Sequence, residues 1–315
     1  MERISSFVLD FIKKYVPGED ILVEEPMSRH TTFRAGGKAK CLVRIGSVNQ
    51  LGALLPYFRE NGIPYFILGN GSNLLVGDGG YPGVMLQIGS KMNRIKAEEE
   101  CIRAEAGALL SRVAGFALEN GLTGLEFASG IPGTVGGALV MNAGAYGGEI
   151  KQVVRQVTVI DERGEISVIE NDAMEFGYRT SVIKNRPFIV LIKKKALTVL
   201  EAVFALSPGE ESGIRARMEE LAQRRKEKQP LEYASAGSTF KRPEGFFAGK
   251  LIMEAGLRGL RVGGAQVSEK HCGFVINTGG ATAGDILAVI REVQKRVREN
   301  TGITLETEVI LLGDF

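Results

Sequence analysis

Residues 121–148 constrain the fold of this chain more than any other stretch of the sequence. Nine of these 28 residues are glycine, and no charged side chain stands between Glu126 and Glu149. Glycine loses more backbone entropy on folding than other residues, so this density is expected where a positive φ or a close approach of bare backbone is required. Rows of backbone N–H groups bind phosphates and polar ring atoms. The stretch therefore predicts either ligand-lining loops or tight turns in a β-rich core.

Composition narrows the class of partner. The chain has 315 residues, enough for two or three domains, and its 39 Lys and Arg nearly balance 37 Asp and Glu. This balance gives no reason to expect nucleic acid or an anionic membrane, so we expect a small-molecule partner. The N-terminus lacks an apolar run of signal-peptide length and no segment could span a bilayer, so we expect a cytoplasmic protein.

Cysteine and histidine usage makes a disulfide framework or a metal site unexpected. Cys41, Cys101 and Cys272 lie far apart and form no Cys-x-x-Cys pair, which indicates reduced, buried thiols. The two histidines, His30 and His271, are too few for a multi-histidine metal site. We therefore expect no bound metal.

The apolar pattern predicts an α+β protein in three consecutive segments, 1–80, 81–199 and 200–315. Helices are expected at residues 4–15, 47–61, 109–120, 213–228, 246–255 and 285–300. Strands are expected at residues 39–45, 64–68, 84–88, 94–96, 101–105, 153–161, 166–170, 188–192 and 303–312. The first segment therefore contains a β-α-β unit, and the apolar run 64–68 predicts a strand covered on both faces.

A second glycine-containing turn, Gly69-Asn-Gly-Ser-Asn73, follows directly on the predicted strand 64–68. Leu74 stands where a Gly-x-Gly-x-x-Gly fingerprint needs its last glycine, so the nicotinamide-binding pattern is not satisfied. The turn still offers backbone and amide donors at the carboxyl end of a strand, where nucleotides bind in α/β folds. It predicts a phosphate-binding turn, with an ordinary polar turn as the alternative.

Seven motifs occur along the chain in a characteristic order. They are Gly69-Asn-Gly-Ser-Asn-Leu-Leu-Val76, Ile131-Pro-Gly-Thr-Val-Gly-Gly-Ala138, Asn142-Ala-Gly-Ala-Tyr-Gly147, Tyr178-Arg-Thr-Ser181, Gly237-Ser-Thr-Phe-Lys241, Ala265-Gln-Val-Ser-Glu-Lys-His271 and Leu305-Glu-Thr-Glu-Val309. This series resembles that of the UDP-N-acetylenolpyruvoylglucosamine reductase (MurB) family of bacterial wall synthesis. The resemblance extends over nearly the whole chain, from about Arg29 to Gly313.

The resemblance implies a fold, a cofactor and a reductant. The fold is a FAD-binding fold of the vanillyl-alcohol-oxidase and p-cresol-methylhydroxylase type in residues 1–80 and 81–199, followed by an α+β substrate domain in 200–315 whose last strand packs back on the FAD domain. The cofactor is FAD, held without a covalent bond since no His or Cys lies in the glycine loops, and the reductant is NADPH. The implied FAD-binding residues are Gly69, Asn70, Gly71, Ser72, Asn73, Leu74, Gly133, Thr134, Val135, Gly137, Ala138, Asn142, Gly144, Ala145, Tyr146 and Gly147.

Three residues match the family's catalytic positions. Arg179 matches the arginine that binds the enolpyruvyl carboxylate and stabilises the developing negative charge. Ser238 matches the serine that protonates the substrate carbon, a role that depends on neighbouring charge because an isolated serine is a poor acid. Glu308 matches an active-site glutamate and is expected on the last strand, facing an increasingly apolar surface. The alternatives are a surface arginine, a turn serine and an exposed strand charge.

The resemblance also implies substrate contacts. Tyr178 precedes the catalytic arginine, and Lys241 follows the catalytic serine. Arg225 and Lys228 fall where the family binds the UDP diphosphate, a role that suits cations, although they could equally face solvent on a charged helix. Arg242 stands where some members carry an amide, so contacts with uridine diphosphate are expected to be rearranged here.

Only five residues, 182–186, separate Ser181 from Pro187, so the inserted tyrosine-bearing loop of one family subgroup is missing and the shorter subgroup is the better match. We expect a monomer that converts a UDP-N-acetylglucosamine enolpyruvate to UDP-N-acetylmuramate. Two rival functions remain open. One is a different flavin enzyme on the same fold, such as an oxidase, and the other is a non-catalytic nucleotide-binding protein.

Overall fold

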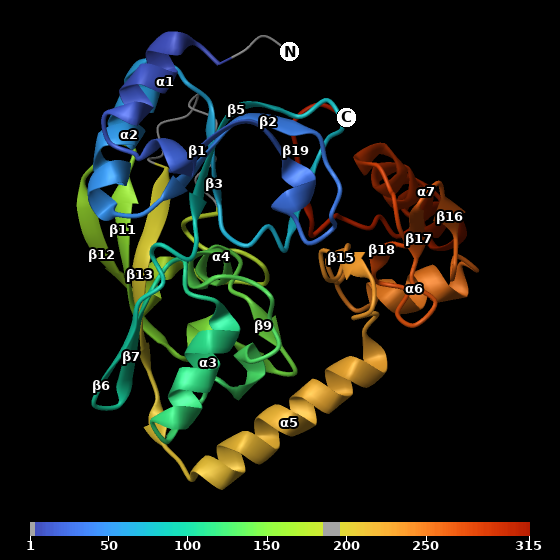
Figure 1. The fold of residues 1–315 in the computed structure, drawn as a ribbon. Helices are drawn as coiled ribbons and strands as arrows, with labels where there is room; N and C mark the ends of the chain where they lie inside the picture. Colours follow the sequence, from blue (N-terminus) through green and yellow to red (C-terminus); the bar gives the residue numbers. More distant parts are fainter. Residues whose placement is uncertain (1–3, 185–195) are drawn as a thin grey trace. The chain divides into compact units, whose positions relative to one another are not determined.

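The computed structural model describes residues 4–184 and 196–315, which form two compact units (Figure 1). The first comprises Met1–Val23, Cys41–Asn70 and Gly83–Arg224, and the second comprises Glu24–Lys40, Gly71–Pro82 and Arg225–Phe315. Each unit has its own cluster of buried apolar side chains. Since both units are built from separate pieces of the chain, the division into three consecutive segments stays a prediction. The predicted strand 188–192 lies outside the described residues.

Two larger sheets dominate the first unit. A four-stranded sheet has the order β1-β2-β5-β3, with β1 (Ile21–Pro26), β2 (Lys38–Ile45), β5 (Tyr81–Ile88) and β3 (Tyr65–Leu68). A five-stranded sheet has the order β12-β11-β13-β7-β6, with β12 (Ile166–Glu170), β11 (Val154–Asp161), β13 (Leu197–Ala205), β7 (Cys101–Glu105) and β6 (Ile95–Glu98). The chain passes between the two units within β1, β2 and β5.

Helices and short elements complete this unit. The helices are α1 (Ser6–Lys13), α2 (Val48–Glu60), α3 (Leu110–Glu119) and α4 (Val135–Val140), with α5 (Glu211–Lys228) running on into the second unit. The two-residue strands are β8 (Leu122–Thr123), β9 (Gly144–Ala145), β10 (Gly148–Glu149) and β14 (Ser207–Pro208). Single 3₁₀ turns are η1 (Gly18–Asp20), η2 (Met27–Arg29, in the second unit), η3 (Glu126–Ala128), η4 (Ile150–Gln152) and η5 (Asn171–Met174).

Helix α2 forms as its local sequence predicts. The Ser47 hydroxyl accepts a hydrogen bond from the backbone N–H of Gln50 at 3.4 Å, which caps the helix. The apolar stripe that includes Leu51 and Phe58 is fully buried. The strand after it differs from its prediction, because β3 stands at the edge of its sheet and, among the described residues, pairs with β5 alone, in parallel. Its first three residues are half-buried, so the expectation of a strand covered on both faces was wrong.

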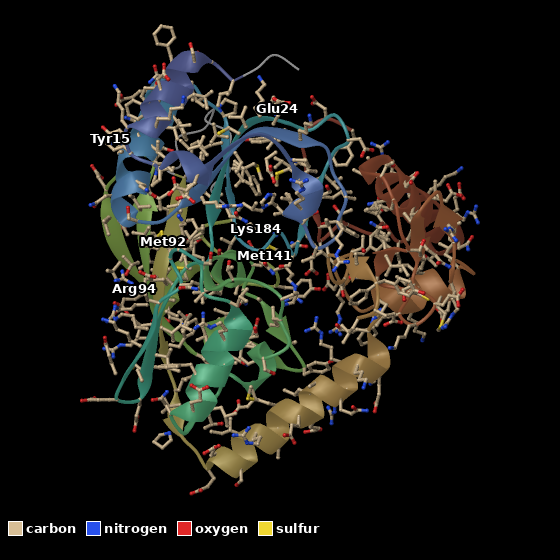
Figure 2. All side chains as sticks on the ribbon, in the orientation of Figure 1. Tyr15, Glu24, Met92, Arg94, Met141 and Lys184 are labelled. Atoms are coloured by element: carbon tan, nitrogen blue, oxygen red, sulfur yellow. The ribbon has the colours of Figure 1, made fainter. Side chains whose placement is uncertain are left out.

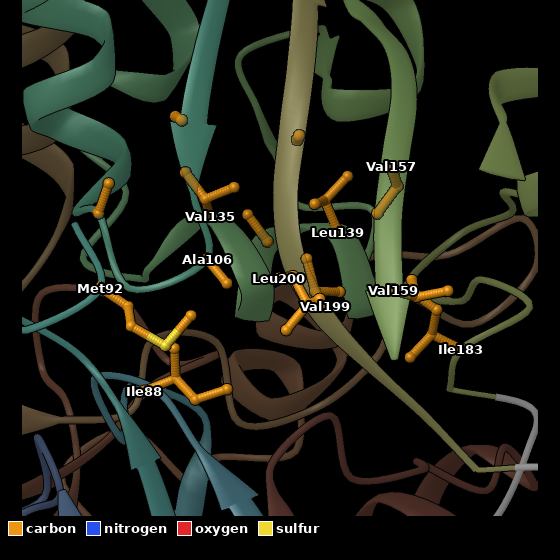
Figure 3. Close-up of a cluster of buried hydrophobic side chains, with 14 of the residues drawn as sticks. Ile88, Met92, Ala106, Val135, Leu139, Val157, Val159, Ile183, Val199 and Leu200 are labelled. Carbon is orange, nitrogen blue, oxygen red and sulfur yellow. The ribbon is translucent and has the colours of Figure 1, made fainter. Parts of the chain in front are cut away.

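The glycine-rich stretch packs on the five-stranded sheet through α4. Figure 3 shows Val135 and Leu139 of α4 among the side chains of Val157 in β11 and Leu200 in β13. All four are buried, at most 4% exposed. Burial of apolar side chains of this size stabilises the packing by about 1.5–3 kcal/mol each. The loops on either side of α4 are therefore held on a rigid layer.

The second unit contains a small antiparallel sheet and two helices. The sheet order is β15-β18-β17-β16, with β15 (Ala234–Ser235), β18 (Val275–Asn277), β17 (Ala265–Val267) and β16 (Arg261–Val262). The helices are α6 (Ala248–Glu254) and α7 (Ala283–Thr301). The Asp78 carboxylate accepts hydrogen bonds from the N–H groups of Ala283 and Gly284 at 2.9 and 2.7 Å, which satisfies the start of α7. The early segment 71–82 thus belongs structurally with the C-terminal part of the chain.

The last strand is shorter than predicted. Only β19 (Ile310–Leu312) of the expected strand 303–312 forms, and it pairs in parallel with β4 (Leu74–Val76). The last strand therefore pairs with a strand of its own compact unit, and its packing on the FAD domain stays a prediction. Residues 303–309 do not join that ladder because their backbone bonds with a different partner, the turn at 239–241. Glu308 consequently lies two residues before the strand, and the predicted strand face that carries it is wrong.

Within the described residues, no helix combines the length and apolar character needed to cross a membrane. Cys41 and Cys272 are buried, whereas Cys101 is half-buried. Burial raises the pKa of the Cys41 thiol to about 12, so this cysteine stays a neutral, unreactive thiol at physiological pH.

Candidate active site

Two glycine motifs far apart in the sequence meet in the first unit. The Asn70 side chain donates from Nδ2 to the carbonyl of Pro132 at 2.5 Å. A Cβ atom on Gly69 would overlap the hydroxyl of Thr134, so only glycine allows this approach. Thr134 in turn caps α4, its hydroxyl accepting from the N–H of Gly137 at 3.5 Å. The first half of the predicted phosphate-binding turn therefore lies against the loop that begins the glycine-rich stretch.

This junction fits a phosphate. The backbone N–H groups of Gly133 and Thr134 donate to no acceptor within the part of the chain that the structure describes. Thr134 is buried, and a buried N–H without a protein acceptor is uncommon. Adjacent N–H groups are the donors used by phosphate-binding nests. The residues present are thus compatible with the FAD diphosphate that the sequence predicts here.

Gly71 is required for a different reason. It has a φ of +61°, and a Cβ atom here would overlap the carbonyl oxygen of His30. The N–H of Thr32 donates to the Gly71 carbonyl at 3.2 Å, which completes a close backbone contact inside the second unit. We expected glycines in this turn because the cofactor approaches the backbone closely. At Gly71 the group that approaches closely is the backbone of His30, so the protein's own packing requires this glycine. A cofactor contact by Gly71 stays a prediction.

Several other predicted FAD-binding residues have their side chains in the core. Leu74, Val135 and Ala138 are buried, and Leu74 pairs with Ile310. Any contact that these three make with the cofactor must therefore come from their backbone. Ala145, Tyr146 and Gly147 form the tip of the β9–β10 hairpin, where Tyr146 is exposed and has a φ of +53°.

Arg179 is held against the glycine-rich loop. It sits in a tight turn in which Gly177 and Thr180 exchange backbone hydrogen bonds of 3.2 and 3.3 Å, and its φ is +54°. Its Nη2 donates to the carbonyl of Gly144 at 3.3 Å, and its guanidinium lies 5.3 Å from the centre of the Tyr178 ring. Lys184, labelled in Figure 2, donates from Nζ to the Arg179 carbonyl at 2.7 Å. The cation is thereby fixed beside the loop by its backbone and its side chain.

Asn142 ties the same turn to the glycine-rich loop. Its side chain is fully buried, with Nδ2 donating to Glu149 Oε2 at 2.7 Å and to the Gly177 carbonyl at 3.1 Å. Its Oδ1 accepts from the N–H of Lys151 at 3.0 Å. The sequence predicted a cofactor contact at Asn142, and the structure adds a positioning function for its side chain that no local pattern indicated.

The second unit brings Ser238 and Glu308 close in its backbone network. Ser238 is exposed and follows Gly237, whose φ of +73° opens the turn. The N–H of Glu308 donates to the carbonyl of Thr239, the residue after Ser238, at 2.8 Å. The Asn73 side chain donates from Nδ2 to the Glu308 carbonyl at 3.1 Å. Sequence reasoning missed both contacts because each joins residues far apart in the sequence, 235 positions in the case of Asn73 and Glu308.

Thr239 holds this turn in place. It is fully buried, its N–H donates to the Gly273 carbonyl at 2.9 Å, and its hydroxyl accepts from the N–H of Val275 at 3.0 Å. The turn that carries Ser238 is therefore bonded to the loop before β18 and to β18 itself.

The predicted substrate-binding cations of the second unit occupy different settings. Lys241 pairs with Glu306, Nζ to Oε2 at 2.7 Å, and this bond and charge lower the pKa of the Glu306 carboxyl. Arg225 is half-buried near the end of α5 and donates from Nε to Gln229 Oε1 at 3.0 Å, whereas Lys228 is exposed. Lys241 thus carries a partly neutralised charge.

The members of the predicted site are divided between the two units. The first unit holds Gly69, Asn70, the loops of the glycine-rich stretch, Tyr178 and Arg179. The second holds Gly71, Ser72, Asn73, Leu74, Arg225, Lys228, Ser238, Lys241 and Glu308.

Comparison with known proteins defines the class first. Residues 39–170 match the family model described as FAD binding domain. The chain is a FAD-dependent oxidoreductase with a FAD-binding domain in a fold of mixed helices and strands. Residues 229–312 match the model described as UDP-N-acetylenolpyruvoylglucosamine reductase, C-terminal domain.

Full-length relatives then identify the family. The UDP-N-acetylenolpyruvoylglucosamine reductase of Clostridium perfringens (strain SM101) is 52% identical over 295 residues, 94% of each chain. That of Caldanaerobacter subterraneus subsp. tengcongensis is 50% identical over 311 residues, 99% of this chain and 100% of the relative. The crystal structure of the Thermus caldophilus enzyme (MurB) superposes with a TM-score of 0.76 at 34% identity, covering 93% of this chain and 98% of that one. The chain belongs to the UDP-N-acetylenolpyruvoylglucosamine reductase family.

Proposed function

We propose that this protein uses NADPH to reduce the enolpyruvyl group of UDP-N-acetylglucosamine enolpyruvate, forming UDP-N-acetylmuramate for peptidoglycan synthesis. Full-length similarity to reductases of this name supports the reaction. The observation within the fold that carries it is the anchoring of Arg179 to the Gly144 carbonyl, because a fixed cation beside a flavin loop suits a reduction that builds up negative charge. Bound FAD supplies the hydride acceptor and donor at its N5 position.

The chain's own groups divide the remaining work. Arg179 binds the substrate carboxylate and stabilises the charge that develops next to it, since a guanidinium offers paired donors to a carboxylate. Ser238 donates a proton to the substrate carbon on which this negative charge develops. Glu308 donates from its N–H to the carbonyl of Thr239, which bonds it to the turn that carries Ser238.

Cations and an aromatic side chain bind the rest of the substrate. Arg225 and Lys228 take the diphosphate, and Gln229 orients the Arg225 guanidinium through its 3.0 Å hydrogen bond. Lys241 supplies a third positive group, whose charge is partly neutralised by the carboxylate of Glu306. Tyr178 stacks with Arg179 and limits the directions that this cation can take.

We place the enzyme in the cytoplasm as a monomer. Both NADPH and UDP-sugars are cytoplasmic metabolites, which supports this location. The elution volume of the purified protein tests the oligomeric state, since a dimer would double the apparent mass from the 34.0 kDa of one chain.

Ser238→Ala tests the proposed chemistry. The substitution should leave reduction of FAD by NADPH nearly unchanged, because the proton is needed only when substrate accepts the hydride. Reoxidation of the reduced flavin by the enolpyruvyl substrate should slow by about 10²- to 10⁴-fold, the usual contribution of general acid catalysis.

Ser235→Ala is the matched control, because Ser235 lies three residues away on β15 and has no part in the proposed chemistry. It should reoxidise at the wild-type rate. Normal reoxidation in Ser238→Ala, or equal damage to both half-reactions, would remove Ser238 from the mechanism. Rapid consumption of oxygen without the enolpyruvyl substrate would instead favour an oxidase.

A further inference from the structure

The two peptide groups that flank the Cα atom of Glu308 are each held by a hydrogen bond. On one side, its N–H donates to the Thr239 carbonyl at 2.8 Å. On the other, its carbonyl accepts from Asn73 Nδ2 at 3.1 Å. Two residues later, the N–H of Ile310 donates to the Asn73 carbonyl at 3.0 Å. Asn73 therefore bonds to the segment 308–310 through its side chain and its backbone.

These bonds matter because Glu308 lies outside any strand. Residues of β19 have their backbone direction fixed by the parallel ladder with β4, which begins only at Ile310. The backbone of Glu308 has no such ladder and takes its direction from Thr239 and Asn73. The φ and ψ angles that these two bonds hold set the direction of the Glu308 Cα–Cβ bond, from which the side chain starts.

We propose that Asn73 is a positioning residue for Glu308, a role that rests on the proposed reductase function. Its side-chain amide orients the peptide group between Glu308 and Val309, so that the glutamate side chain starts from the position needed when the substrate is reduced. The turn at 71–74 then has two tasks. One is the cofactor contact that the sequence predicts for it, and the other is the bond of the Asn73 side chain to the Glu308 carbonyl.

Asn73→Ala tests this role in the FAD-loaded enzyme. Because the Asn73 amide is bonded to Glu308 and the substitution keeps the backbone of the turn, the variant should retain FAD and be reduced by NADPH within about twofold of wild type. Its limiting rate of reoxidation by the enolpyruvyl substrate should fall about 10- to 100-fold, the scale expected for a misplaced active-site group. The substrate concentration giving half the limiting rate should change by less than about threefold, because the groups that bind the diphosphate are untouched.

Gln294→Ala is the matched control. Gln294 on α7 also donates from a side-chain amide, Nε2, to a backbone carbonyl of the same segment, that of Leu305 at 2.8 Å. The variant loses an equivalent hydrogen bond three residues from Glu308 and should reoxidise at the wild-type rate. Asn73→Ser is the second test, for use if Asn73→Ala does not fold, because serine keeps a hydrogen-bond donor on a shorter side chain. Its reduced flavin should be reoxidised by the substrate more slowly than that of wild type.

Three outcomes would overturn the proposal. Loss of FAD from the Asn73 variants would make the side chain a cofactor ligand. Wild-type reoxidation in both variants would remove the positioning role, and equal slowing in Gln294→Ala would reduce it to general support of the segment. A wild-type enzyme that the substrate does not reoxidise would refute the proposed function itself, which distinguishes that failure from a failure confined to Asn73.

Discussion

Asn142 should be among the costliest single substitutions in the first unit. Its fully buried side chain makes three hydrogen bonds, two to backbone groups and one to the Glu149 carboxylate. Asn142→Ala removes all three, leaves the Lys151 N–H without its partner and leaves the Gly177 carbonyl with the N–H of Thr180 alone. The Gly177 carbonyl belongs to the turn that carries Arg179, so the damage should reach function as well as stability.

The magnitude follows from these contacts. Two neutral bonds at about 1 kcal/mol each and one bond to a charged group at about 1.5–3 kcal/mol give a loss of about 3.5–5 kcal/mol. Asn142 also has a φ of +42°, which asparagine tolerates and alanine does not, adding about 1 kcal/mol. A total of about 4.5–6 kcal/mol is a large share of the roughly 5–15 kcal/mol that stabilises a typical domain.

Denaturant unfolding of the FAD-loaded protein measures this loss, with Asn142→Gly as the comparison. Glycine loses the same three bonds but tolerates the positive φ, so Asn142→Gly should be about 1 kcal/mol more stable than Asn142→Ala. A loss below about 1 kcal/mol in both variants would show that the three bonds contribute little. Asn142→Ala as stable as Asn142→Gly would show that the backbone conformation carries no strain.

Three further predictions concern a glycine, a histidine and the cofactor. Gly71→Ala should destabilise the protein much more than Gly62→Ala. Both glycines have a φ near +60°, but only at position 71 would the alanine Cβ overlap the His30 carbonyl. Equal unfolding midpoints of the two variants would refute this. Burial lowers the pKa of His271, whose Nδ1 accepts from the Gly273 N–H, so the unfolded state binds more protons than the folded state as the pH falls below 6.5. The free energy of unfolding should therefore fall below this pH in wild type and fall less in His271→Gln. Parallel pH dependences of the two proteins would contradict this. The purified protein should be yellow and release its FAD on acid precipitation, and flavin that stays with the precipitate would disprove non-covalent binding.

Local signals predicted most of the helices because their causes are local. The cap at Ser47 and the stripe ending at Phe58 are both read within a few positions of the sequence, and both lie where α2 forms. The run 303–312 failed for the opposite reason. Its apolar alternation fits a strand, but residues before Ile310 bond to the distant turn after Gly237, and such competition cannot be read from periodicity.

The candidate site likewise has features that could be predicted from local motifs and features that depend on distant contacts. The motifs predicted which residues belong to it, and the structure holds Arg179 on the glycine-rich loop and bonds Glu308 to the turn of Ser238. What the sequence could not provide is the supporting layer, Asn142 and the Asn73 side chain, because these amides act on groups far along the chain. A motif match names an asparagine without saying which way its amide points.

The most direct test of the central claim follows the flavin alone. The FAD-loaded enzyme is reduced by one equivalent of NADPH without oxygen, freed of nicotinamide nucleotide, and mixed rapidly with UDP-N-acetylglucosamine enolpyruvate. We predict that the flavin absorbance returns in full as one equivalent of UDP-N-acetylmuramate forms. A flavin that stays reduced with this substrate, or that reoxidises only when oxygen is admitted, would contradict the assignment of this chain as the reductase.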